Sequence, residues 1–329
     1  MELHKTKLSE MLGIKYPIIM APMFLVSNTK MVIEAVNAGI TGAIPALNYR
    51  TIKELDSALK ELKTANCKPF GINLIVNKSN IKFKDQLRVC VENNVDFIIT
   101  SLGSPKPVID ACKPKGIKVF CDVVDVKYGK KVEELGADAV IAVNSDAGGH
   151  AGDRNAKELI PLLNKECNIP VISAGGIGDG KGIKNVLEEG ACGLSMGTIF
   201  IACQEAQISQ DYKQAIVDHG AKDIVFTTKL SGTPCTVINT PFVQEIGTKE
   251  SWLEWVLNKN KLLKKYAKML IAYKGMKMLE KSAFSASYKN MWCAGPSCEF
   301  VDEIRPVKKI VSDLINEFHY SQNFQKDAE

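Results

Sequence analysis

The feature that most constrains the fold is a repeated alternation of short apolar runs with helical patterns between residues 16 and 203. Each run is apolar throughout and does not alternate with polar residues, which is typical of parallel strands buried on both faces. Eight such units in this length favour a closed (β/α)8 TIM barrel over an open doubly wound sheet. The expected strands are 16–20, 41–46, 69–74, 97–100, 118–123, 139–143, 170–174 and 192–196.

The pattern changes after residue 203. Residues 204–321 are expected to form a helical lid segment that packs on the barrel and returns to it near the C-terminus. Within this segment, 226–239 has a loop-like pattern and 252–281 a long, Lys-rich helical pattern whose charge we interpret as a solvated face. The expected division is therefore a barrel, 1–203, the lid segment, and a tail, 322–329.

Composition limits the classes of partner and compartment. The 329 residues are 46% hydrophobic, and the net charge of +5 is spread along the chain, so nucleic acid is not the expected partner. Ten cysteines without a CxxC pair predict a reducing, cytoplasmic compartment. No apolar run has the length needed to cross a membrane, and four dispersed histidines predict no metal site.

The most informative candidate site is the stretch NSDAGGHAG, residues 144–152, which directly follows an apolar run. Gly148 and Gly149 let the backbone pass close to a ligand, and His150 places an imidazole beside them. This pattern predicts a ligand-facing loop in which His150 is catalytic. The alternative is a turn histidine whose hydrogen bonds are satisfied inside the loop.

Two glycine-containing turns follow the last two expected strands. Gly175-Gly176 follows the seventh strand and Gly197-Thr198 the eighth. Backbone N–H groups in such turns bind anions, and barrels of this class often bind phosphate at this position. The pair predicts a phosphate site, with two tight turns as the alternative. The stretch 175–182 is not a dinucleotide fingerprint, because no G-x-G-x-x-G fits it. It is not a Walker loop either, because Gly182 replaces the required Ser or Thr.

Five motifs occur in order along the barrel: PIIMAPM (17–23), GINL (71–74), DAGGHAG (146–152), AGGI (174–177) and MGT (196–198). As an ordered set they resemble the nitronate monooxygenase family, formerly called 2-nitropropane dioxygenases. The motifs are shared with the flavin-dependent enoyl-acyl-carrier-protein reductases II and with NADH:quinone reductases of the same fold. The resemblance implies an FMN-containing barrel, which agrees with the expected phosphate site.

The resemblance also implies a role for each matched residue. The 21–23 segment would lie along the isoalloxazine ring, Asn73 would hydrogen-bond to the ring, and Gly148 and Gly149 would allow its close approach. The glycine turns would bind the phosphate, and His150 would be the catalytic residue. The implied cofactor-binding residues are Ala21, Pro22, Met23, Asn73, Asp122, Gly148, Gly149, Ala174, Gly175, Gly176, Gly197 and Thr198.

Three residues depart from the family pattern. Asp122 stands on the fifth strand where some relatives carry a lysine near the flavin, and a negative charge there disfavours an anionic reduced flavin. Thr236 stands where an arginine is common, and Pro296 replaces the glutamine of a late A-G-Q loop. These departures bear on the substrate more than on the cofactor.

The implied function is FMN-dependent oxidation of alkyl nitronates or nitroalkanes by O2 to carbonyl compounds and nitrite. His150 would remove the α-proton of a neutral nitroalkane or donate a hydrogen bond to the nitro group. The main alternative is an NAD(P)H-dependent reductase of enoyl thioesters or quinones. A flavin-free barrel isomerase or lyase and a non-catalytic flavin-binding protein are the other classes. Expected partners are the small-molecule substrate and O2, with NAD(P)H and a second copy of the chain, as a homodimer, as further candidates.

Overall fold

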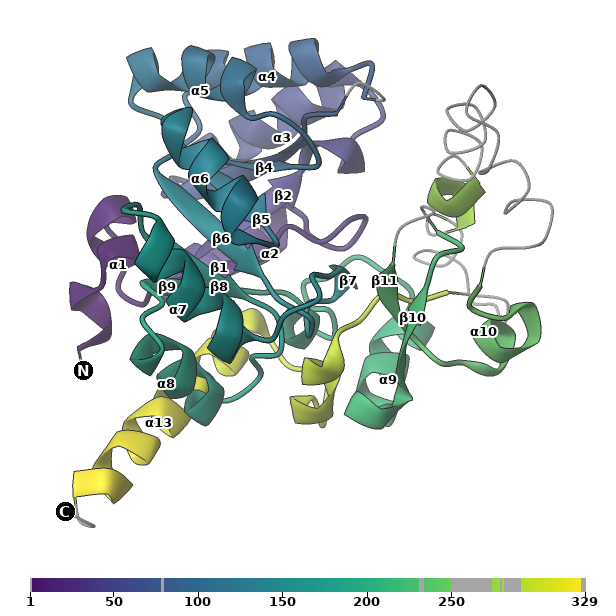
Figure 1. The fold of residues 1–329 in the computed structure, drawn as a ribbon. Coiled ribbons are helices and arrows are strands. Elements are labelled where there is room, and N and C mark those ends of the chain that lie inside the picture. Colours follow the sequence, from purple (N-terminus) through teal and green to yellow (C-terminus); the bar gives the residue numbers. More distant parts are fainter. Residues whose placement is uncertain are drawn as a thin grey trace.

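The computed structural model describes residues 2–77, 80–230, 234–249, 274–278, 280 and 291–326. Its centre is a closed barrel of eight parallel strands in the order β1-β2-β3-β4-β5-β6-β8-β9, closed by pairing of β9 with β1 (Figure 1). The predicted (β/α)8 TIM barrel is therefore confirmed. The strands are β1 (Ile18–Met20), β2 (Thr41–Pro45), β3 (Phe70–Ile75), β4 (Phe97–Ser101), β5 (Lys118–Val123), β6 (Ala139–Val143), β8 (Val171–Ala174) and β9 (Gly193–Met196).

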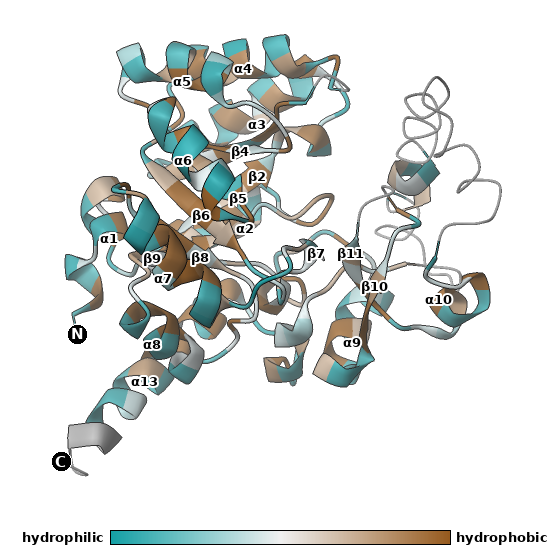
Figure 2. Ribbon diagram, viewed as in Figure 1, coloured by the Kyte–Doolittle hydropathy of each residue, from teal (hydrophilic) through white to brown (hydrophobic). Residues whose placement is uncertain are grey.

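A helix follows each of the first seven barrel strands and covers the outside of the barrel (Figure 1). Five of these helices begin at a side chain that accepts a hydrogen bond from a backbone N–H of the first turn: Asn28, Thr51, Asp125, Asn155 and Asp179. Figure 2 shows the hydrophobic residues concentrated on the strands and polar residues on the outer helices. The helices are α2 (Thr29–Asn37), α3 (Ile52–Thr64), α4 (Phe83–Glu92), α5 (Lys106–Cys112), α6 (Val126–Glu134), α7 (Ala156–Glu166) and α8 (Gly180–Glu188).

The eighth outer helix comes from the C-terminal part of the chain. Helix α13 (Val307–Lys326) packs against α8 and α2 and completes the ring. Its approach to α8 is so close that a Cβ added to Gly180 would lie 2.1 Å from the backbone nitrogen of Phe318. The helix continues to Lys326, into the segment 322–329 that was expected to be a tail. Residues 197–306 are therefore a long connection between the last barrel strand and the last barrel helix.

This connection contains a second, smaller sheet as well as helices. Strands β10 (Ile224–Thr227) and β11 (Cys235–Ile238) are antiparallel, and β11 also pairs with β7 (Gly149–His150). The loop-like interpretation of 226–239 was therefore wrong, because two four-residue strands are too short to give a clear period. The expected helix 252–281 lies mostly outside the described residues, although 274–278 are helical. Two α-helices of the connection come before this segment in the chain: α9 (Gln210–Asp218) and α10 (Pro241–Ile246).

The interior of the barrel is filled from its amino-terminal end. Phe97 and Phe120 stack inside it with ring centroids 5.3 Å apart, in a buried cluster with Ile141. Leu8 of α1 (Lys7–Leu12) closes this end, since a Cβ added to Gly193 would lie 2.3 Å from its side chain. In this fold, functional sites lie at the other end, at the carboxyl ends of the strands.

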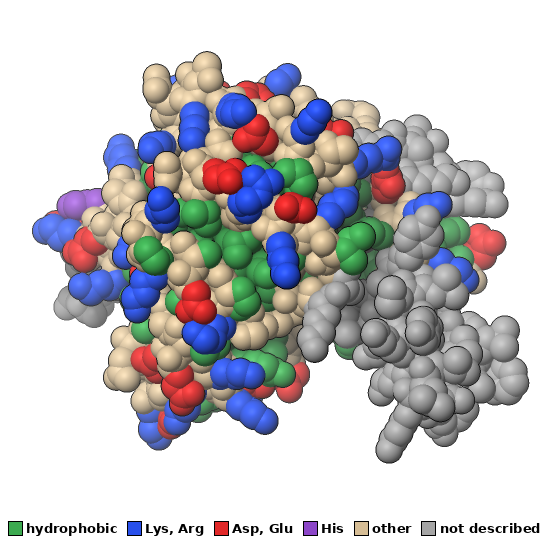
Figure 3. All heavy atoms as spheres, turned by 90° about the horizontal axis from the view of Figure 1, so that it is seen from above, with side chains coloured by type: hydrophobic (Ala, Val, Ile, Leu, Met, Phe, Trp, Pro, Cys, Tyr) green, Lys and Arg blue, Asp and Glu red, His purple; other side chains and the backbone are tan. Residues whose placement is uncertain are grey.

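Charges on the surface are mixed in sign. Over the described part of the face drawn in Figure 3, Lys and Arg side chains are interspersed with Asp and Glu. Among the described residues, no helix is both long enough and apolar enough to span a bilayer.

Candidate active site

The predicted site residues converge at the carboxyl ends of the barrel strands, which we call the mouth of the barrel. The backbone nitrogen of Ala21 donates to the carbonyl oxygen of Met196 at 2.8 Å, so the loop after β1 lies against the loop after β9. A Cβ added to Gly197 would lie 3.5 Å from the side chains of Ala21 and Met23. The 21–23 segment therefore borders one of the two predicted phosphate turns.

The loop after β6 is fastened to the other phosphate turn by Asn144. Its Nδ2 donates to the carbonyl oxygen of Gly175 at 3.0 Å, and its Oδ1 accepts from the backbone nitrogen of Asp146 at 2.8 Å. Gly175 and Gly176 have φ values of 116° and 75°. An added Cβ would lie 2.3 Å from Asn144 Oδ1 at Gly175 and 2.9 Å from Asp146 Cβ at Gly176. The close packing of these two loops therefore requires glycine at both positions.

The same loop also touches the turn after β9. A Cβ added to Gly148 would lie 2.9 Å from Thr198 Oγ1 and 3.0 Å from the backbone nitrogen of Gly295. That nitrogen donates to Thr198 Oγ1 at 2.9 Å, so the late loop around Gly295 reaches back to the barrel. Gly149 differs from Gly148, because it has a φ of 82° and an added Cβ would meet nothing within 4 Å. Gly149 is thus the glycine of this pair that faces open space.

The backbone around His150 is held by the connection that follows the barrel. His150 lies on β7, and Gly149 pairs with Thr236 of β11. The Thr236 hydroxyl accepts a hydrogen bond from the backbone nitrogen of Gly149 at 2.9 Å and donates to the carbonyl oxygen of Ala147 at 2.9 Å. The residue that departs from the family pattern therefore fixes the loop that carries His150. Sequence reasoning noted Thr236 only as a departure, since the pairing of β7 with β11 was not predicted.

His150 is an exposed residue at the mouth, but protein atoms around its imidazole still reduce the access of water to the ring. Burial disfavours the imidazolium form and lowers the pKa of His150 below its ordinary value of 6.5. The imidazole is therefore mostly neutral at pH 7. In that form it has one nitrogen that accepts a proton and one that donates a hydrogen bond.

A line of three polar side chains crosses the mouth from β3 to β5. Asn73 Nδ2 donates to Ser101 Oγ at 2.7 Å, and Ser101 Oγ donates to Asp122 Oδ2 at 2.5 Å. Burial raises the pKa of Asp122 to about 6, and the hydrogen bond from Ser101 opposes this effect. Sequence reasoning missed Ser101, although the strand period places it on the inward face two residues after Ile99.

The mouth offers groups that fit a phosphorylated flavin. No hydrogen bond within the described residues uses the backbone N–H of Gly175 or Thr198, so both can donate to an anion. Asn73 is buried and presents Oδ1 as an acceptor, because its Nδ2 is occupied. No atom lies within 4 Å of a Cβ added to Gly149, so nothing packs against this glycine beside His150.

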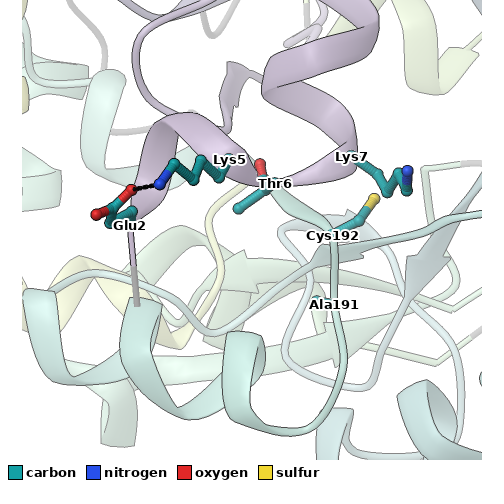
Figure 4. Close-up of a pocket in the computed structure, with 6 residues that line it drawn as sticks. All are labelled: Glu2, Lys5, Thr6, Lys7, Ala191 and Cys192. Atoms are coloured by element: carbon teal, nitrogen blue, oxygen red, sulfur yellow. Dashed lines mark ion pairs between the residues drawn. The ribbon is translucent and has the colours of Figure 1, made fainter.

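A surface pocket lies at the opposite, amino-terminal end of the barrel, before β9 and around the first residues of the chain (Figure 4). Lys5 pairs with Glu2 there, and the pocket contains none of the predicted site residues. Within the described ranges, no cluster of three or more His, Cys, Asp or Glu side chains could hold a metal ion. The lining residues are Glu2, Lys5, Thr6, Lys7, Ala191 and Cys192.

Known proteins are similar to this chain in sequence and in fold. The family model for nitronate monooxygenase matches residues 5–317. The chain is 32% identical over 242 residues to the (3aS,4S,5R,7aS)-5-hydroxy-7a-methyl-1-oxo-octahydro-1H-indene-4-carboxyl-CoA dehydrogenase of Rhodococcus jostii, covering 74% of this chain and 68% of that protein. It is 29% identical over 286 residues to a probable nitronate monooxygenase of Staphylococcus saprophyticus, covering 73% and 80%.

A solved structure agrees over the full length. FabK from Thermotoga maritima superposes with a TM-score of 0.84 at 29% identity and covers 99% of both chains. The resemblance that the motifs indicated is thereby confirmed. The chain belongs to the nitronate monooxygenase family, whose members are flavin-containing oxidoreductases.

Proposed function

We propose that this chain binds FMN at the mouth of the barrel and uses O2 to oxidise alkyl nitronates or nitroalkanes to carbonyl compounds and nitrite. One observation carries the proposal. The loop that bears His150 also contacts Gly175 and Thr198, the two residues with available N–H donors. An acid–base group and an anion site are thus held at a fixed separation by one loop.

Different residues around the mouth would bind the phosphate and the ring of FMN. The N–H groups of Gly175 and Thr198 would hold the phosphate, while Ala174, Gly176 and Gly197 shape the two turns. The 21–23 segment and the open space at Gly149 would receive the ring, with Asn73 Oδ1 as a hydrogen-bond acceptor. When bound, FMN supplies the electron-transfer chemistry.

His150 supplies the proton chemistry. Its neutral imidazole accepts the α-proton of a neutral nitroalkane, because burial disfavours the protonated form. When the substrate is already a nitronate, the other ring nitrogen donates a hydrogen bond to a nitro oxygen. The Thr236 hydroxyl keeps the backbone around the imidazole in one position for both roles.

A second candidate is an NAD(P)H-dependent reductase of enoyl thioesters or quinones, with His150 as the proton donor. The full-length match to FabK and the match to a carboxyl-CoA dehydrogenase favour this candidate. The barrel and the FMN site would be the same. The two candidates differ in the source of electrons, which is the nitronate in one case and NAD(P)H in the other.

Aerobic turnover distinguishes these functions. We expect the protein reconstituted with FMN to consume O2 and release nitrite from propionate 3-nitronate without NAD(P)H. No nitrite from the nitronate, together with NADH or NADPH oxidation that needs crotonyl-CoA or a quinone, would establish the reductase instead. Protein that shows no flavin absorption after FMN is added would support a flavin-free isomerase or lyase.

A further inference from the structure

The hydrogen bonds from Asn73 to Asp122 run toward the carboxylate when Asp122 is ionised. The two hydrogens of Asn73 Nδ2 go to the carbonyl oxygen of Ile99 at 3.2 Å and to Ser101 Oγ at 2.7 Å. The Ser101 hydroxyl has one hydrogen, which it donates to Asp122 Oδ2 at 2.5 Å. While Ser101 donates to Oδ2, Oδ1 is the carboxyl oxygen that this line of hydrogen bonds leaves available to a proton.

Asp122 is the next-to-last residue of β5, so it lies near the carboxyl end of the strand. Asp122 follows Phe120 on the inward side of β5, so the apolar interior that contains Phe120 and Ile141 lies beneath it. Asp122 is half-buried as a residue, and within the described residues no hydrogen bond reaches Oδ1. The apolar side desolvates the carboxylate and brings its pKa to about 6.

Among the described residues, no cation forms an ion pair with this carboxylate. Burial raises the pKa of Asp122, and the hydrogen bond from Ser101 opposes the rise. The strands on either side contribute hydroxyl and apolar side chains. The titratable groups of β5 and of the segments around it include Cys121, whose pKa burial raises to about 12, and the pair of Lys118 with Asp138 at the amino-terminal end. The others are Asp96 before β4, Asp125 after β5, and Asp146, His150, Asp153 and Arg154 after β6.

We propose that Asp122 is the proton-holding group of the mouth: when negative charge is placed there, Oδ1 takes a proton from solvent hydronium. An O–H bond forms on Oδ1, a water molecule is released, and no electron is transferred in this step. The incoming negative charge then faces a neutral acid instead of a second anion. The inference rests on the proposed function, because the charge is that of a nitronate or of reduced FMN.

This role explains why an aspartate can stand at position 122, where a lysine would neutralise an anion directly. A carboxylate that stayed ionised would repel the anion, whereas a carboxyl that titrates near neutrality gains a proton at small cost. The hydrogen bond from Ser101 favours the ionised form and therefore makes protonation of Asp122 less favourable. Removing the hydroxyl should therefore make protonation easier.

The test is the midpoint potential of bound FMN, measured by dye equilibration from pH 5 to pH 8. The variants are Asp122→Asn, whose amide oxygen can still accept from Ser101, and Asp110→Asn, which alters an exposed carboxyl on α5. We expect wild type and Asp122→Asn to agree at pH 5. Above pH 6 the wild-type potential should fall more steeply, because reduction takes up one extra proton. Asp110→Asn should follow wild type.

Ser101→Ala provides a change of opposite sign. In this variant the point at which the potential departs from that of Asp122→Asn should move to higher pH. A difference between wild type and Asp122→Asn that is constant across the pH range would overturn the inference while leaving FMN binding intact. Failure of wild type to bind FMN would overturn the proposed function, and the inference with it.

Discussion

His150 lies directly opposite Cys235 in the antiparallel pairing of β7 with β11. Cys235 belongs to the connection between the last strand and the last helix of the barrel, so the imidazole is positioned by a segment outside the barrel strands. The site is therefore assembled from both parts of the chain. Changes in the connection should alter chemistry at the mouth without altering the barrel.

The hydroxyl of Thr236 provides the first prediction. Thr236→Val keeps the shape of the buried side chain but leaves the nitrogen of Gly149 and the oxygen of Ala147 without this partner. The cost should be about 1–3 kcal/mol of unfolding free energy, and kcat should fall about 10- to 100-fold as His150 loses its position. Urea unfolding and steady-state kinetics measure both effects. Thr236→Ser should restore both values, and a Val variant with wild-type kinetics would contradict the positioning role.

A second prediction concerns His150 itself. His150→Asn should leave FMN bound but lower kcat/KM for a neutral nitroalkane about 10²- to 10⁴-fold, because no base remains to take the α-proton. The loss with a preformed nitronate should be smaller, since only a hydrogen bond changes. The control is His4→Asn at the amino-terminal end, where His4 is exposed beside Glu2. Equal losses with both substrates would remove His150 as the base.

The pH profile gives a third prediction. Because burial lowers the pKa of His150, the neutral base persists to lower pH than in a free imidazole. For a neutral nitroalkane, kcat/KM should rise with pH, with its inflection below pH 6.5, and reach a plateau above the inflection. Asp122→Asn should retain this inflection, which separates it from titration of Asp122. An inflection above 6.5 would show that the imidazolium is favoured instead.

A fourth prediction tests the phosphate turn. Gly175→Ala should cost about 1–3 kcal/mol and weaken FMN binding about tenfold, since Gly175 has a φ of 116° and its Cβ would lie 2.3 Å from Asn144 Oδ1. Gly220→Ala is the matched control, because Gly220 has a φ of −109° and open space around it. Calorimetric titration with FMN and thermal unfolding compare the two. Unchanged FMN affinity in Gly175→Ala would place the phosphate elsewhere.

The barrel could be predicted from the sequence because its signals are local. Each strand is an apolar run, and caps such as Asn28 and Thr51 mark where helices begin. The glycine turns and His150 were recognised for the same reason, since short motifs carry them. The structure nevertheless gives Gly175 and Gly176 a packing role that the motif alone does not reveal.

The remaining features depend on contacts between distant residues. The pairing of His150 with Cys235 joins segments that no local period connects, and the two short strands of the connection resemble a loop in sequence. Ser101 was missed because its importance arises only when β3, β4 and β5 lie side by side. These features depend on tertiary strand pairing, which local sequence patterns do not reveal.

The most direct test of the account is anaerobic mixing of the FMN-loaded protein with propionate 3-nitronate, followed by visible absorption. The account predicts prompt loss of the oxidised flavin bands with the nitronate and return of the bands when O2 is admitted. An unchanged flavin spectrum with the nitronate, together with rapid bleaching by NADH or NADPH, would contradict nitronate oxidation and establish the reductase.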